Sequence, residues 1–150
     1  MNRTYVITGA GSGIGAATAK ALKDLGNIVI GVDLKNSDID ADLSTPLGRH
    51  EGAKKVIETA NGSIDAVIAC AGLAHPTAQT VSVNYFGVTE FLFALLPTLT
   101  KSKTPRVVIT SSVASIMPNS PELVEAMCAN DEAKAVEIAQ ALVDAGNGGD

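Results

Sequence analysis

The chain has 150 residues, of which 46% are apolar, with a net charge of −5 and a pI of about 4.9. This length fits one domain, and its core must be aliphatic because Trp is absent and aromatic residues make up only 3%. Lys and Arg are scattered, which excludes the basic surface that nucleic acid or an anionic membrane requires.

The positions of the cysteines and the hydropathy of the chain indicate which kinds of site and segment to expect. Cys70 and Cys128 lie far apart in the sequence with no histidine at ligand spacing, so no metal site is predicted. The N-terminus lacks the apolar run of a signal peptide. The apolar stretch 81–99 carries Asn84 and Glu90, and it is expected to be a buried helix, too short and too polar to span a membrane. A cytoplasmic protein without membrane or nucleic acid partners is predicted.

Apolar β-branched runs alternate with helical patterns along the whole chain. Strands are expected at 4–8, 28–33, 39–43, 65–69 and 106–110. Helices are expected at 16–25, 46–60, 80–96 and 122–144, the last broken near Asn130. Continuous apolar strands are typical of sheets covered on both faces. The pattern therefore predicts an α/β protein with a parallel sheet and right-handed crossovers.

A glycine-rich stretch, TGAGSGIG, joins the first strand to the first helix and contains Gly9, Gly11, Gly13 and Gly15. A sharp turn, a close phosphate and tight helix packing each favour a residue without Cβ. The new helix also offers free N–H groups and the positive end of its dipole to a diphosphate. The stretch predicts dinucleotide binding, with a glycine-rich turn that binds nothing as the alternative.

The glycine spacing departs from G-x-G-x-x-G because Ile occupies position 14. The pattern Thr8-Gly9-x-x-x-Gly13-x-Gly15 instead resembles the cofactor motif of the short-chain dehydrogenase/reductase family. Further stretches agree with that family in order: Asp33, Asp42-Leu43, CAG at 70–72, VNYFG at 83–87 and ITSSVAS at 109–115. Within the family, ADLST, CAGLA, VSVNYFG and SSVAS are most similar to the bacterial 3α-hydroxysteroid dehydrogenase/carbonyl reductase branch.

This resemblance implies a Rossmann-type doubly wound sheet with strand order 3-2-1-4-5. It implies a dinucleotide-binding core at 1–115 and, in the same domain, a helical insert at 116–150. It also implies a set of NAD-binding positions, which are Thr8, Gly9, Ser12, Gly13, Ile14, Gly15, Asp33, Leu34, Asp42, Leu43, Cys70, Ala71 and Gly72.

Three of these positions have a further interpretation. A carboxylate at Asp33 can accept both ribose hydroxyls and repels a 2′-phosphate, which favours NAD. NADP is the alternative, because Lys35 can serve a phosphate. Asp42 fits an adenine contact and a solvated loop acid equally well. Cys70 is interpreted as a small buried thiol whose backbone approaches the cofactor.

Ser112 and Asn84 match catalytic positions of the family. Ser112 follows the fifth strand at its carboxyl end, where open α/β sheets bind ligands, and by resemblance it hydrogen-bonds the substrate oxygen. Asn84 is expected to be a buried amide that holds a water beside the active-site lysine and kinks its helix. The alternative is a helical Asn satisfied by backbone groups.

The family's proton donor is a tyrosine in a Tyr-x-x-x-Lys pair, and neither Tyr5 nor Tyr85 has Lys four residues on. We expect the final AGNGGD to be the turn before that helix in a longer protein, with strands six and seven missing here. The fifth strand would then be an apolar unpaired edge that favours aggregation.

The sequence thus predicts an NAD(P)-dependent oxidoreductase that acts on a hydroxyl or carbonyl compound, such as a steroid, in a homodimer or homotetramer. The 150-residue chain is expected to be inactive alone. The alternative is a protein that binds dinucleotide without catalysis, as a sensor or a partner subunit.

Overall fold

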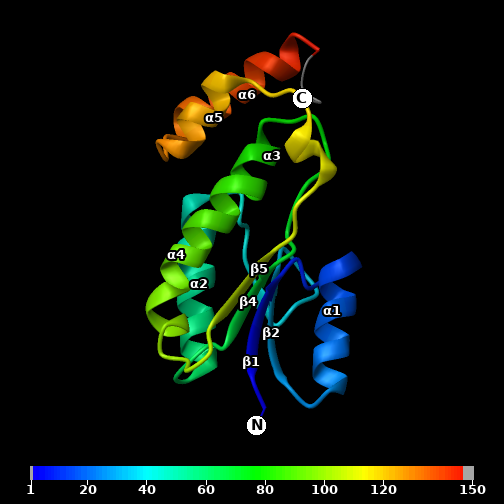
Figure 1. The fold of residues 1–150 in the computed structure, drawn as a ribbon, viewed down its shortest axis with the longest axis vertical. Helices are drawn as coiled ribbons and strands as arrows, with labels where there is room; N and C mark the ends of the chain where they lie inside the picture. Colours follow the sequence, from blue (N-terminus) through cyan, green and yellow to red (C-terminus); the bar gives the residue numbers. More distant parts are fainter. Residues whose placement is uncertain (1, 147–150) are drawn as a thin grey trace.

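One parallel sheet organises the computed structural model, which describes residues 2–146 (Figure 1). Its strands are β1 (Thr4–Thr8), β2 (Ile28–Asp33), β3 (Ile39–Asp40), β4 (Ala66–Ala69) and β5 (Arg106–Ile109). Their order in the sheet is β3-β2-β1-β4-β5. The predicted Rossmann-type arrangement is confirmed. Strands β2 and β3 are added on one side of β1, and β4 and β5 on the other, and this switch of side opens a crevice at the carboxyl ends of the strands.

Helices cover both faces of the sheet, α1 (Gly13–Asp24) on one side and α2 (Pro46–Ala60) and α4 (Gly87–Leu99) on the other (Figure 1). Val6 and Ile7 are neighbours in β1, and both are fully buried. Since successive strand residues point to opposite faces, Val6 packs with Phe91 of α4 while Ile7 packs with Ala19 of α1. The continuous apolar runs in the sequence follow from this two-sided burial.

The third strand is shorter than predicted. The expectation of a strand over 39–43 is wrong beyond Asp40, because the chain turns there. The amide of Ala41 makes the last strand-like contact, to Asp33 O at 2.8 Å. Asp42 then accepts hydrogen bonds from Ser44, which leads into the cap of α2. Thr45 caps this helix, because its Oγ1 accepts a hydrogen bond from Gly48 N at 3.0 Å, and Pro46 stands in the first turn.

The helix expected at 80–96 runs without interruption from Gln79 to Leu99, and it passes through Pro97. Its parts are α3 (Gln79–Val81), the π-helical segment η1 (Ser82–Phe86) and α4. A π-helical turn inserts one extra residue and re-aims the side chains around it. Asn84 lies in the middle of this turn.

This helix is long and apolar enough, by length and composition, to cross a membrane. The expectation that the stretch is too short and too polar is therefore wrong. In the structure the helix packs along the sheet, and Phe91, Leu95 and Leu99 lie in the main core beside β1 and α2. Phe93 and Leu96 point outward and are 71% and 45% exposed.

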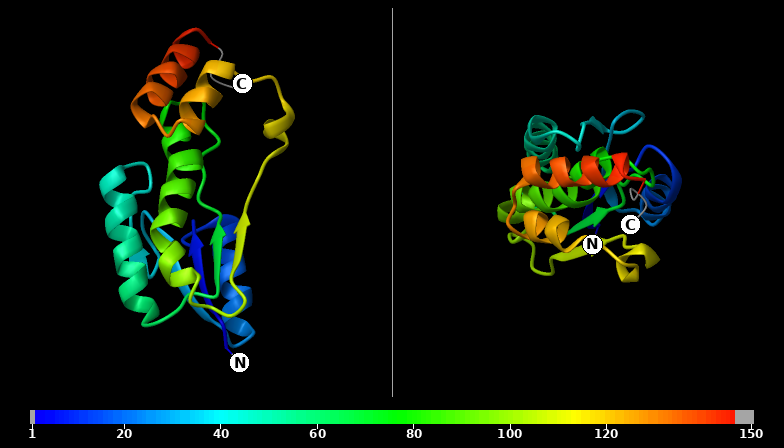
Figure 2. Two further views of the ribbon diagram at one scale, coloured as in Figure 1. Left: turned by 60° about the vertical axis from the view of Figure 1, so that its left-hand side comes forward. Right: turned by 90° about the horizontal axis from the view of Figure 1, so that it is seen from above.

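A helical hairpin follows the sheet, formed by α5 (Pro121–Cys128) and α6 (Glu132–Asp144) after the short 3₁₀ helix η2 (Val113–Ile116). The break near Asn130 is confirmed, and that residue takes a left-handed φ of 57°. The hairpin lies beyond the carboxyl edge of the sheet (Figure 2) and packs on η1 through Phe86, Ala126 and Ala135. In the expected AGNGGD turn, residues 147–150 lie outside the described part of the chain.

The edge strand β5 is exposed along its whole length. Val107, Val108 and Ile109 are 46%, 53% and 53% exposed, and β5 pairs only with β4 among the described residues. An apolar edge with free backbone donors and acceptors is a template for strand addition.

We therefore expect the chain to self-associate through β5, and Val108→Lys to reduce this association because a charge on an edge strand opposes pairing. Size-exclusion chromatography with light scattering at micromolar concentration measures it. Leu25→Lys is the control, because Leu25 is a 77% exposed apolar residue at the end of α1. A monomeric wild-type chain, or equal effects of both variants, would contradict this prediction.

Candidate functional site

The turn between β1 and α1 brings backbone segments into close contact. A Cβ on Gly15 would lie 2.1 Å from Gly9 O, and one on Gly9 would lie 2.8 Å from Ala71 N. Gly9 also has a φ of +70°, which side-chain-bearing residues avoid. The turn is thus packed against both its own helix and the chain after β4. At Gly13 the surroundings are open, with no atom within 4 Å of an added Cβ.

The N-terminus of α1 faces this open space with its amides available. Ser12 occupies the N-cap position but makes no side-chain capping bond, and the first turn contains no acidic residue. Helices usually satisfy such amides with a cap side chain or water. Here the free N–H groups and the helix dipole favour an anion.

Asp33 ties the glycine turn to the end of β2. Its Oδ2 accepts a hydrogen bond from Gly11 N at 2.9 Å, and its Oδ1 accepts from Leu34 N at 2.7 Å. A Cβ on Gly11 would lie 2.5 Å from the backbone oxygen of Lys35 and 3.1 Å from this carboxylate, so a side chain there would collide with the backbone after β2. A carboxylate has about four acceptor positions, so Asp33 keeps acceptor capacity for hydroxyl donors.

The opposite side of the crevice is built by the turn after β3. Asp42 Oδ1 accepts from Ser44 N at 2.9 Å and from Ser44 Oγ at 2.6 Å. This local ring fixes the backbone of Leu43, whose side chain is 6% exposed. One oxygen of Asp42 is therefore committed to the turn, and the other is without a protein partner among the described residues.

The floor of the crevice follows β4. Thr8 Oγ1 accepts from Ala71 N at 3.1 Å, which joins the ends of β1 and β4. Cys70 is half-buried, and burial raises the pKa of its thiol above the ordinary value. The thiol therefore stays protonated near neutral pH and is a poor nucleophile.

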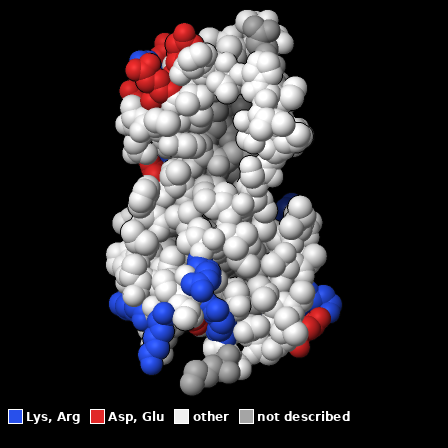
Figure 3. Space-filling model, viewed as in Figure 1, with Lys and Arg blue, Asp and Glu red and all other residues white. Residues whose placement is uncertain are grey.

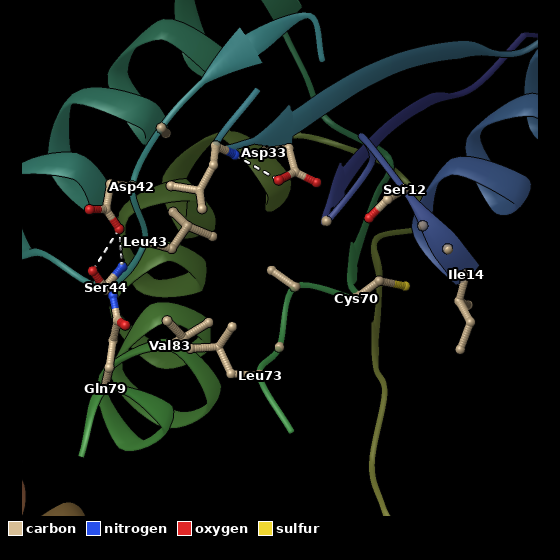
Figure 4. A pocket seen from close by; sticks show the side chains of 17 residues that line it. Ser12, Ile14, Asp33, Asp42, Leu43, Ser44, Cys70, Leu73, Gln79 and Val83 are labelled. Atoms are coloured by element: carbon tan, nitrogen blue, oxygen red, sulfur yellow. Dashed lines mark hydrogen bonds between the residues drawn. The ribbon is translucent and has the colours of Figure 1, made fainter. Parts of the chain in front are cut away.

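These segments enclose a pocket of about 580 Å³, within the size range of small-molecule sites (Figure 4). Ser12 and Ile14 lie on one side, Asp42, Leu43 and Ser44 on the other, and Cys70 between them. All but one of the predicted cofactor-binding residues line this pocket, the exception being Thr8. The predicted residues that line it are Gly9, Ser12, Gly13, Ile14, Gly15, Asp33, Leu34, Asp42, Leu43, Cys70, Ala71 and Gly72. Thr8 lies beneath the floor, 2% exposed, with its hydroxyl bonded to Ala71.

Sequence reasoning missed part of the lining, which also includes Ala41, Ser44, Leu73, Gln79 and Val83. Ser44 and Leu73 could have been predicted from their neighbours, because Ser44 lies in the turn with Asp42 and Leu73 directly follows Gly72. Val83 stands beside Asn84 in the VNYFG stretch. Nothing in the sequence marks Gln79 or Ala41.

Asn84 fixes the backbone of Leu73, which directly follows the floor of the pocket. Its Oδ1 accepts from Leu73 N at 2.8 Å and its Nδ2 donates to Leu73 O at 2.9 Å, as a neighbouring strand residue would. The prediction of a buried amide is wrong, because the side chain is exposed. Its partners are backbone groups, as the alternative interpretation required.

Ser112 and Asn84 line a second pocket of about 300 Å³, together with Ala71, Gly72, Val88, Thr110 and Ser111. The two pockets share Ala71 and Gly72 and therefore adjoin each other. Ser112 is exposed, and its Oγ accepts from Ala114 N at 3.2 Å as the cap of η2. Its hydroxyl proton is free to donate to a ligand oxygen.

No group of three or more metal-binding side chains comes together within residues 2–146. The described residues of the two pockets present backbone amides, the carboxylates of Asp33 and Asp42, several hydroxyls and the thiol of Cys70.

The short chain dehydrogenase family model matches residues 3–124 of the sequence. The chain belongs to this family. The 3-alpha-hydroxysteroid dehydrogenase/carbonyl reductase of Comamonas testosteroni is 41% identical over 140 residues, which cover 90% of this chain and 54% of that protein. The coniferyl-alcohol dehydrogenase of a Pseudomonas strain is 37% identical over 100 residues, which cover 63% of this chain and 39% of that protein.

Among solved structures, the 3-alpha-hydroxysteroid dehydrogenase of a Pseudomonas species, complexed with NADH, superimposes with a TM-score of 0.87 and 42% identity. The match covers 92% of this chain and 61% of that one. The chain spans about half the length of the curated short-chain dehydrogenase relatives it matches. The family and the expected branch resemblance are confirmed.

The glycine contacts lead to a stability prediction. Gly15→Ala should lower the free energy of unfolding by about 3 kcal/mol, because the added methyl overlaps a backbone carbonyl that cannot move away. Gly13→Ala should cost only about 1 kcal/mol, the strain of its positive φ, since the space around it is open. Urea denaturation of both variants measures the difference, and equal losses would contradict the proposed packing.

Proposed function

We propose that this chain binds NAD in the larger pocket and forms the nucleotide-binding part of an oxidoreductase that acts on a hydroxyl or carbonyl compound. The main support is that twelve residues predicted to contact the cofactor, from four separate segments, line a single pocket at the carboxyl edge of the sheet. The family membership and the NADH complex of a relative support the same assignment.

The shape of the crevice fits a dinucleotide. Gly9, Gly11 and Gly15 are places where a side chain would collide with backbone, while the space beside Gly13 is open. A diphosphate at the uncapped end of α1 would receive amide donors and the positive end of the helix dipole. The adenine would lie beside Leu43 and Asp42, and bound NAD supplies the hydride acceptor.

Asp33 supports NAD over NADP. Its carboxylate faces the pocket from the end of β2, held in place by Gly11 and Leu34. It can accept hydrogen bonds from ribose hydroxyls, whereas a 2′-phosphate there would place two negative groups side by side. The side chain of Lys35 is exposed and does not line the pocket.

Ser112 and Asn84 are proposed to serve the substrate. Ser112 would donate its hydroxyl proton to the substrate oxygen, next to the pocket floor shared with the cofactor site. Asn84 would keep Leu73 and Gly72 at the boundary between the two pockets. The names of two relatives support a hydroxysteroid or a small carbonyl compound as the proposed substrate.

The acid–base pair expected for this chemistry is not present in the 150 residues, since Tyr5 and Tyr85 are each without Lys four residues on. A positioned acid–base group contributes about 10²–10⁴ in rate. A second candidate is a dinucleotide-binding protein without catalysis. Reading the gene past the codon for Asp150 separates the two, because only the first requires an in-frame Tyr-x-x-x-Lys.

Cofactor binding is tested by calorimetry with NADH and NADPH. We expect wild type to prefer NADH, and Asp33→Asn to bind NADH about tenfold more weakly because charged hydrogen bonds to the ribose are lost. NADPH should bind the variant more tightly than it binds wild type. Asp40→Asn is the control, since it removes the same charge from an exposed position. Failure of wild type to bind either dinucleotide at millimolar concentration would refute the proposal.

Turnover gives a separate prediction. The 150-residue chain should bind NADH and yet produce none from NAD and a hydroxysteroid, because it has no tyrosine–lysine pair to accept the proton. Absorbance at the NADH band measures this. Steady NADH formation by the purified chain would show that another group supplies the base.

A further inference from the structure

Arg49 of α2 is a charged residue that lies in the interior, with 1% of its surface exposed. It contacts two carboxylates. The carboxylate of Glu132 accepts hydrogen bonds from both terminal nitrogens of the guanidinium, from Nη1 to Oε1 at 3.1 Å and from Nη2 to Oε2. Glu90 Oε2 lies 2.7 Å from Nε, in an ion pair without hydrogen-bond geometry. A buried guanidinium requires such partners, because leaving it unpaired is strongly unfavourable.

Arg49 also reaches the wall of the nucleotide pocket. Its Nη1 donates to Leu43 O at 3.2 Å and to Ser82 O at 3.3 Å. Leu43 lines the pocket, and Ser82 directly precedes Val83, which lines it too. The guanidinium therefore holds two segments of this wall from behind.

Glu132 belongs to a distant part of the chain. It is the first residue of α6 and joins the α5–α6 hairpin to Arg49. The hairpin has a second attachment, since Ala126 and Ala135 pack on Phe86 of η1. None of its described residues lines the larger pocket, so it can act on that pocket only through the wall behind it.

From this arrangement we propose that Arg49 is a positioning residue that couples the α5–α6 hairpin to cofactor affinity. Glu132 orients the guanidinium, and the guanidinium fixes the carbonyls of Leu43 and Ser82 in the adenine-side wall. The inference rests on the proposed function, since it concerns the same pocket. By linkage the coupling is reciprocal, so bound cofactor stabilises the docked hairpin.

The direction of the effect distinguishes this coupling from simple electrostatics. Acidic side chains gather on the hairpin end of the molecule, and basic ones at the opposite end (Figure 3). Removing one negative charge there should, by charge alone, favour an anionic dinucleotide slightly. Loss of the Glu132 contact should instead weaken binding, because the wall loses its support.

The experiment is calorimetric titration of the 150-residue chain and its Glu132→Gln variant with NADH and with AMP. We expect both ligands to bind the variant about tenfold more weakly, a typical size for coupling between sites. The equal loss for AMP follows because the affected wall would contact the adenosine half. Glu137→Gln is the matched control, since Glu137 is an exposed acid on the same helix. It should bind as wild type does or slightly more tightly.

Hydrogen exchange of the wild-type chain gives a second measurement. Saturating NADH should slow amide exchange in α5 and α6, and this slowing should be absent in Glu132→Gln. A change in folding stability alone would leave the affinity of folded molecules unaltered and would not produce this ligand dependence.

The outcomes separate the two proposals. If wild type binds neither NADH nor AMP, the proposed function fails. If wild type binds and Glu132→Gln binds equally well, or loses affinity for NADH only, the coupling is refuted while the function stands. Should Glu132→Gln not fold, unchanged exchange in the wild-type hairpin on NADH addition refutes the coupling by itself.

Discussion

The structure depends on one close backbone contact, the approach of α1 to the end of β1. Gly15 lies so near Gly9 O that no side chain fits between them. This contact sets where α1 begins and leaves its first amides open toward the crevice. It also places Gly11 against Asp33, so that β2 ends at the same point in space as the turn. The position of the carboxylate is thus determined by glycine packing.

Features that depend on local chemistry were predictable. The cap formed by Thr45 and Pro46, the left-handed Asn61 and the break at Asn130 each follow from what one residue type does in a turn. The strand order followed from the family resemblance, and the parallel sheet covered on both faces followed from continuous apolar runs such as that of β1. The family resemblance located most of the pocket lining, of which the glycine stretch supplies Gly9, Ser12, Gly13, Ile14 and Gly15.

Features that depend on contacts between residues far apart in the sequence could not be predicted. Residues 41–43 carry an apolar and β-compatible pattern, but the Asp42–Ser44 contacts end β3 early. Asn84 stands in an apolar stretch, yet its π-helical turn aims it outward to Leu73. Arg49 gave no signal, because arginine is normally exposed and its burial requires two acids remote in sequence. Such contacts arise only once the elements have docked.

The two helical layers differ greatly in the core they share with the sheet. Beneath α2 and α4, twelve buried residues form one cluster, whereas beneath α1 the described residues contribute only Ile7, Ala19 and Val29. Regions with few buried contacts open first in native-state fluctuations. We therefore expect the α1 layer to open more readily than the α2–α4 layer, and it carries the amides that face the crevice. A ligand held by those amides would bridge the weak layer to the strong one and raise the resistance of the whole sheet to local opening.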